Sequence, residues 1–122
     1  RRSSDLNKLS AELGNADVEL VRKELGTEFD MIVHEPDGIL EIGQAGHSKA
    51  SGIERLCASL GIAKEDTYAF GDSANDVEML EFVAHGIAMG NGTDVAKNAA
   101  EFVTTDIHKD GIWNGLKHYG LI

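Results

Sequence analysis

The second half of the chain alternates short apolar runs with amphipathic segments, and this alternation limits the fold more than any other feature. Strand-like runs occupy residues 67–70, 85–89 and 101–104. Segments with apolar residues at helical spacing flank these runs, at residues 53–60, 74–84, 93–100 and 110–116. Strands separated by helices of about ten residues form parallel sheets with helical crossovers. We therefore expect an α/β domain built on a parallel sheet with flanking helices.

Glycines and capping residues set the expected ends of these helices. Gly61 is placed to end the first helix and Thr93 to cap the third. The last helix is expected to start at Asp110 as its cap. Its apolar residues are expected to face the core; they are Ile112, Trp113 and Leu116.

The first part of the chain has a different pattern. A short helix is expected after Ser4, with one apolar face formed by Leu6, Leu9 and Leu13. A second helix is expected from Asp17 to Leu25, with Gly26 just past its end. Residues 29–35 and 39–42 are predicted to form a hairpin around the turn at residues 36–38, and residues 43–46 a linker.

Composition restricts the partners. The chain carries 11 basic and 21 acidic side chains, a net charge of −10, which argues against nucleic acid or an anionic membrane as the main partner. The single cysteine, Cys57, fits a buried thiol in a reducing compartment. No apolar run has the length of about 20 residues that a membrane span needs, and no leader pattern opens the sequence. We expect a cytoplasmic protein.

The main candidate for chemistry is the sequence from Gly71 to Asp76, where an apolar strand gives way to a helix. Ligands of open α/β sheets bind at this edge. A Mg²⁺ ion would relieve the repulsion between two carboxylates four residues apart. Asp72 is the better placed for direct ligation, while Asn75 and Asp76 could hold metal-bound water. In the alternative interpretation Asp72, Ser73 and Asp76 are only helix caps and first-turn acids.

A second candidate is Lys49, at the entry to a helix. A cation there opposes the helix dipole, so a phosphate or carboxylate partner is expected nearby, unless Lys49 is an ordinary exposed lysine. The spacing of Gly43, Gly46 and Lys49 does not fit a Walker A loop. An EF-hand loop starting at Asp72 fails as well, because its glycine and final glutamate positions hold valines.

Together, Lys49 and the sequence Gly71-Asp72-Ser73-Ala74-Asn75-Asp76 resemble the second half of a haloacid dehalogenase (HAD) superfamily phosphatase, and most closely the Cof-type sugar-phosphatase branch. The resemblance extends from about residue 36 to the C-terminus. It includes further motifs in the same order, among them those at residues 60–62, 86–92, 102–105 and 110–112. It implies a HAD-like, Rossmann-like core in residues 47–122 and a remnant of the inserted α/β cap in residues 1–42.

The resemblance also implies roles for individual residues. Lys49 would steady the nucleophile and the transferring phosphoryl group. Asp72 would be the principal Mg²⁺ ligand, and Asp76 would support the metal shell. Asn75, with Ser73, would contact phosphate or substrate.

One departure from the family pattern is decisive. The family's nucleophile and its acid/base form an Asp-x-Asp pair, and these 122 residues contain none. The phosphate-binding Ser or Thr of the family has no clear counterpart either. The resemblance implies a Mg²⁺-dependent phosphatase acting on small phosphorylated metabolites such as sugar phosphates, with this chain inactive alone. The alternative is a non-catalytic binding or assembly module whose exposed sheet edge allows self-association.

Overall fold

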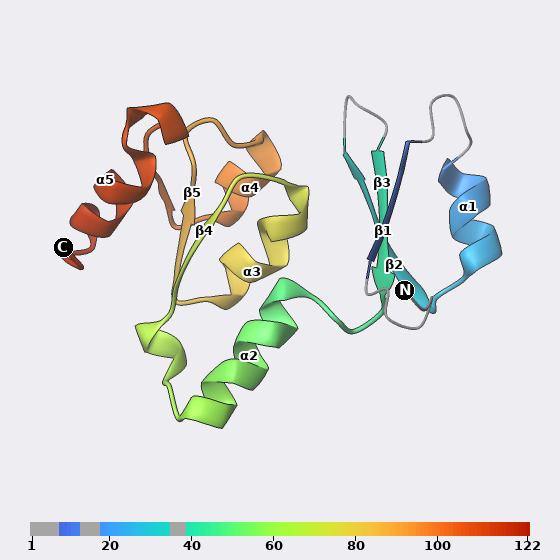
Figure 1. Ribbon diagram of the computed structural model, residues 1–122, viewed down its shortest axis with the longest axis horizontal. Helices are drawn as coiled ribbons and strands as arrows, with labels where there is room; N and C mark the ends of the chain where they lie inside the picture. Colours follow the sequence, from blue (N-terminus) through green and yellow to red (C-terminus); the bar gives the residue numbers. More distant parts are fainter. Residues whose placement is uncertain (1–7, 13–17, 35–38) are drawn as a thin grey trace, which may run out of the picture. The chain divides into compact units, whose positions relative to one another are not determined.

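The computed structural model describes residues 8–12, 18–34 and 39–122. It divides the chain into two compact units, Arg1–His47 and Ser48–Ile122 (Figure 1). Each unit has a sheet of its own. Within the described residues, no helix is both long enough and apolar enough to span a lipid bilayer.

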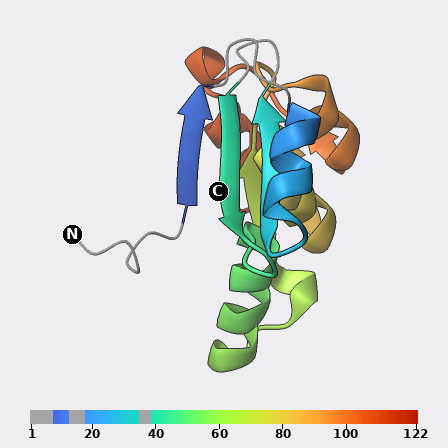
Figure 2. The same cartoon turned by 90° about the vertical axis from the view of Figure 1, so that its right-hand side faces the viewer.

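The first unit is a three-stranded antiparallel sheet with one helix. Its elements are β1 (Lys8–Glu12), α1 (Val18–Leu25), β2 (Phe29–His34) and β3 (Ile39–Gln44). The strand order is β1-β3-β2, and Figure 2 shows the three strands side by side. Leu40 of the central strand is fully buried and lies opposite Val33 of β2. The predicted hairpin and second helix are confirmed, while Asp17, Glu35 and the turn at 36–38 lie outside the described residues.

Two expectations for this unit are wrong in detail. Leu9 was expected in a helix, but it lies in β1, opposite Ile42 of β3. Pairing with a neighbouring strand overrides a weak local helical pattern, because it satisfies the backbone groups of the whole segment. The other residues of that expected helix, Ser4, Leu6 and Leu13, lie outside the described residues. Strand β3 also continues through Gly43 and Gln44, which were expected in the linker.

The second unit is a parallel α/β structure, as predicted. Its sheet has the order β4-β5-β6, and both strand pairs are parallel. The elements are α2 (Lys49–Leu60), β4 (Tyr68–Gly71), α3 (Val77–Phe82), β5 (His85–Ala88), α4 (Asp94–Ala99), β6 (Phe102–Val103) and α5 (Gly111–His118). Single 3₁₀ turns form at Lys64–Asp66, Ala74–Asp76 and Ile107–Lys109. Gly61 in the left-handed conformation ends α2, and the Thr93 hydroxyl caps α4, as expected.

The core of this unit surrounds the central strand. Ile87 and Ala88 of β5 are completely buried, together with Leu80 of α3 and Ala96 of α4. Figure 1 shows α3 and α4 on one side of the strands and α5 on the other. Because β4 and β5 run parallel, the loops that follow them lie at the same edge of the sheet.

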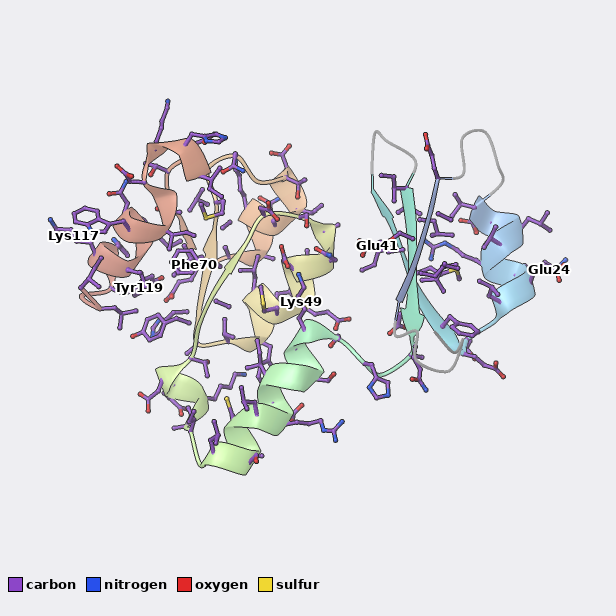
Figure 3. The ribbon with its side chains drawn as sticks, in the orientation of Figure 1. Glu24, Glu41, Lys49, Phe70, Lys117 and Tyr119 are labelled. Atoms are coloured by element: carbon purple, nitrogen blue, oxygen red, sulfur yellow. The ribbon has the colours of Figure 1, made fainter. Side chains whose placement is uncertain are left out.

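Helix α5 packs differently from the prediction. Ile112 and Trp113 were expected in the core, but they are 48% and 52% exposed, and Leu116 is half-buried. The helix approaches the sheet through two buried glycines, Gly111 and Gly115. Figure 3 shows Phe70 lying toward α5, and a Cβ at Gly115 would be only 2.6 Å from its ring. Close packing against glycine turns the larger side chains outward.

Two smaller expectations also fail. Asp110 precedes α5 as predicted, but its backbone is left-handed and its side chain makes no capping hydrogen bond. Cys57 was expected to be buried and is instead only half-buried, in α2.

Candidate active site

Lys49 is the first residue of α2, and the preceding residue fixes that helix end. The Ser48 hydroxyl accepts a hydrogen bond from the Ser51 N–H at 3.1 Å, and the Ser48 N–H donates to the Ser51 hydroxyl at 2.9 Å. This reciprocal capping satisfies two backbone donors of the first turn. It holds the Lys49 backbone in place while half of the side chain stays exposed (Figure 3).

The turn after β4 is tight because Gly71 has no side chain. A Cβ at Gly71 would lie 2.6 Å from the Cβ of Asp76. The absence of that atom lets the Asp76 side chain fold back under the strand end, where the residue is only 4% exposed. Gly71 therefore allows the buried carboxylate of Asp76 to lie at the carboxyl end of a parallel strand.

The Asp76 carboxylate is the centre of the polar network at this edge. Its Oδ2 accepts hydrogen bonds from the N–H groups of Asp72, at 2.9 Å, and Ser73, at 3.2 Å. Its Oδ1 accepts a hydrogen bond from the Lys49 ammonium, with which it forms an ion pair. Burial raises the pKa of Asp76, but Lys49 and the two amides together outweigh that effect and lower the pKa below its usual value. Asp76 is therefore an anion at neutral pH.

The carboxylate partner expected for Lys49 is thus Asp76, which the sequence had not identified as such. The acid lies 27 residues away, so only packing of α2 beside α3 brings the two together. The signal available in the sequence was a lysine at the start of a helix, because a cation at that end opposes the helix dipole and favours a nearby anion.

Ser73 and Asn75 lie in the same turn. The Ser73 hydroxyl donates a hydrogen bond of 2.7 Å to Oδ1 of Asn75. This contact fixes the orientation of the Asn75 amide. The capping part of the alternative interpretation holds for Asp76, because its carboxylate accepts the N–H of Ser73 at the start of the turn.

Asp72 differs from Asp76 in having an exposed side chain. In the parts of the chain that the structure describes, no hydrogen bond or ion pair engages its carboxylate. Its main chain, by contrast, is held on both sides. The N–H donates to Asp76, and the C=O accepts a hydrogen bond of 2.8 Å from the Thr93 N–H.

This arrangement fits a Mg²⁺ site in one respect. Mg²⁺ is commonly held by one or two carboxylates, with water and substrate phosphate completing its shell. The Asp72 carboxylate is an oxygen donor at the sheet edge and is available for this purpose. Both oxygens of Asp76 already accept hydrogen bonds, so direct ligation by Asp76 would compete with Lys49. Among residues 8–12, 18–34 and 39–122, no group of three His, Cys, Asp or Glu side chains converges as a metal cluster.

Comparison with known proteins agrees with the motifs. The family described as haloacid dehalogenase-like hydrolase matches residues 1–116. The chain is 54% identical over 78 residues to an uncharacterized protein in the pdhA 5′ region of Geobacillus stearothermophilus, a match covering 64% of this chain and 82% of that protein. It is 42% identical over 84 residues to 5-amino-6-(5-phospho-D-ribitylamino)uracil phosphatase YitU of Bacillus subtilis, covering 69% of this chain and 31% of that enzyme.

A solved structure gives the same result. The HAD subclass IIB sugar phosphatase BT4131 matches with a TM-score of 0.85 at 30% identity. The match covers 95% of this chain and 44% of that one. The chain therefore spans less than half the length of either phosphatase. On the family match, the strand-turn-helix at residues 68–82 and the motifs that surround it, the protein belongs to the haloacid dehalogenase-like hydrolases.

Proposed function

We propose that this protein provides the lysine and metal-binding half of a Mg²⁺-dependent, Cof-type phosphatase site acting on small phosphorylated metabolites, sugar phosphates among them. The observation that carries the proposal is the contact between Lys49 and Asp76. It holds an ammonium group at the carboxyl end of β4, beside the turn that presents the Asp72 carboxylate. Two of the similar proteins, a sugar phosphatase and a 5-amino-6-(5-phospho-D-ribitylamino)uracil phosphatase, support this substrate class.

Lys49 would act by neutralising charge on the phosphoryl group. An ammonium has three N–H donors, and Asp76 engages it on one side, so donors remain for phosphoryl oxygens. Because Asp76 is buried and ionised, it limits the rotamers of the lysine before substrate arrives. Phosphoryl transfer depends mainly on such positioning and charge stabilisation.

The other residues of the turn would complete this half of the site. Asp72 would hold Mg²⁺, which supplies positive charge to the phosphate and its leaving oxygen. Asn75, oriented by Ser73, would donate its amide to a phosphoryl or substrate oxygen. Asp76 would support the metal shell through the peptide N–H of Asp72 and through Lys49.

The chain by itself is expected to be inactive, since its 122 residues contain no Asp-x-Asp pair. Assay of the purified chain with a generic phosphomonoester and Mg²⁺ tests this expectation. Turnover that disappears in Asp72→Ala would contradict it.

A chimera tests the proposed roles directly. The matching segment of YitU can be replaced by that of this chain, because the two are 42% identical over 84 residues. We expect the chimera to hydrolyse phosphomonoesters, and Lys49→Ala or Asp72→Ala to lower its rate by orders of magnitude. Lys97→Ala and Asp94→Asn, on α4, are the matched surface controls. If all four variants retain the rate of the parent chimera, the assigned roles are wrong.

A second candidate function is self-association. Within the described residues β4 pairs only with β5, so one side of β4 is an edge that another strand could join. Sedimentation of the purified chain tests this candidate, and a folded monomer over a wide concentration range would refute it.

Cys57 is a free thiol, which favours the reducing conditions of the cytoplasm as the place of either function.

A further inference from the structure

The turn between β5 and α4 lies directly against the main chain of Asp72. The Met89 N–H donates to the Gly71 carbonyl at 2.9 Å and continues the pairing of β4 with β5. The chain then turns, with the Gly92 N–H donating to the Met89 carbonyl at 2.9 Å. The Thr93 N–H, which follows, donates to the Asp72 carbonyl.

Gly92 has no room for a side chain. A Cβ there would lie 2.9 Å from the Met89 carbonyl oxygen, 3.0 Å from the Asp72 carbonyl oxygen and 3.1 Å from the Asp72 Cα. All three are backbone atoms, which cannot swing aside as a flexible side chain can. Gly92 is not among the glycines with positive φ. The requirement for glycine here is therefore close approach to Asp72 and not an unusual backbone conformation.

The turn is also held by a second segment of the chain. The Gly90 N–H donates to the Thr105 carbonyl at 3.1 Å, and Oδ1 of Asn91 accepts a hydrogen bond of 2.9 Å from the Ile107 N–H. These contacts tie the turn to the segment that follows β6. A side chain at Gly92 would therefore displace Asp72 as well as the turn itself.

We propose that Gly92 is a positioning residue for Asp72: by allowing the β5–α4 turn to touch the Asp72 main chain, it sets the direction of the exposed Asp72 carboxylate. The Asp76 carboxylate engages the N–H of Asp72 and the Thr93 N–H engages its C=O, so the side chain is left to reach a ligand. The proposal rests on the proposed role of Asp72 as a Mg²⁺ ligand. Mg²⁺ requires near-ideal octahedral geometry at about 2.0–2.1 Å, so a displacement of a few tenths of an ångström weakens binding.

Titration of the 122-residue chain with Mg²⁺ alone, followed by the amide NMR signals of residues 71–76, tests the proposal. We expect Gly92→Ala to raise the Mg²⁺ dissociation constant about tenfold, the range typical of residues that orient a ligand. Gly86→Ala is the control. Gly86 lies at the start of β5, away from the β5–α4 turn, and its Cβ would lie 2.3 Å from the Leu80 carbonyl of α3. That variant should lose at least as much stability and keep the Mg²⁺ affinity of the wild type.

A second pair of variants keeps the test valid if Gly92→Ala does not fold. Thr93 has a φ of −69°, within the range that the proline ring imposes. Thr93→Pro and Thr93→Val both remove the capping hydroxyl, but only proline removes the N–H that holds the Asp72 carbonyl. We expect Thr93→Pro to weaken Mg²⁺ binding several-fold relative to Thr93→Val, and Thr93→Ser to bind as the wild type does.

The outcomes separate the two proposals. Equal Mg²⁺ affinities of the wild type, Gly92→Ala and Thr93→Pro would overturn the positioning role while leaving Asp72 as a ligand. A wild-type chain whose signals at residues 71–76 do not respond to Mg²⁺ would overturn the role of Asp72 in this chain, and the positioning role with it.

Discussion

Lys49 and Asp76 form an ion pair in which the acid is buried and the base is half exposed. The carboxylate therefore loses its water and has protein donors in exchange, while the ammonium keeps access to solvent and to a substrate. The pair joins the start of α2 to the turn before α3. One contact thus serves both the packing of the unit and the proposed chemistry, and mutations can separate the two.

Asp76→Asn should destabilise the chain by about 2 kcal/mol, because the Lys49 ammonium and two backbone donors lose a charged acceptor. Asp72→Asn is the matched control from the same turn, and its exposed side chain predicts a change within about 0.5 kcal/mol. Urea unfolding at neutral pH measures both. Equal effects of the two substitutions would show that the buried network contributes nothing to stability.

Lys49→Arg should separate structure from activity. A guanidinium can pair with the Asp76 carboxylate, so we expect a free energy of unfolding close to that of the wild type. Its planar, larger head would occupy a different position from the ammonium, and the phosphatase rate of the YitU chimera should fall at least tenfold. Lys49→Met should lower both quantities. Full activity of Lys49→Arg would contradict the prediction that the phosphatase rate depends on the exact position of the Lys49 ammonium group.

Acid should weaken the chain through Asp76. The pKa of Asp76 is lowered in the folded state, so the unfolded state takes up the proton first as pH falls. Stability from this group is present above its ordinary value of 3.8 and is lost as pH decreases from there toward the lower folded pKa. Urea unfolding from pH 6 to pH 2 should show a smaller loss in Asp76→Asn than in the wild type. Parallel curves would contradict this assignment.

Alkali should act through Tyr119, at the end of α5. Burial, and then the hydrogen bond that its hydroxyl donates to Glu101, raise the pKa of Tyr119 to about 12. Its contribution to stability is therefore complete below the ordinary value of 10 and is lost as pH rises toward 12. The difference in stability between the wild type and Tyr119→Phe should shrink over this range. A constant difference would mean that the hydroxyl titrates normally.

Two helical glycines should respond to alanine with opposite signs. A Cβ at Gly115 would lie 2.6 Å from the Phe70 ring, so Gly115→Ala should cost about 1–3 kcal/mol. Gly52 lies within α2 with open space around its Cα, so Gly52→Ala should stabilise the chain by about 0.5–1 kcal/mol. Thermal unfolding distinguishes the two. Stabilisation by Gly115→Ala would show that α5 does not pack as closely as described.

Local patterns were sufficient for most elements of the fold. The helix from Lys49 to Leu60 follows from apolar spacing and from Gly61, and the parallel sheet follows from strands separated by helices. Leu9 shows the limit of such patterns, because its strand exists only through pairing with β3. Trp113 shows another limit. Its place on the apolar face of the helix predicted a core position, but Gly111 and Gly115 make the close contact instead.

Residues near one another in the chain were enough to predict the parallel α/β architecture and the turn from Gly71 to Asp76, and the order of several short motifs was enough to predict the family. Tertiary structure alone decided which acid meets Lys49 and that Thr93 holds the Asp72 carbonyl. Those contacts join segments about twenty or more residues apart. They depend on how α2, α3 and the β5–α4 turn pack around one sheet edge, and the spacing of residues along the chain does not encode that geometry.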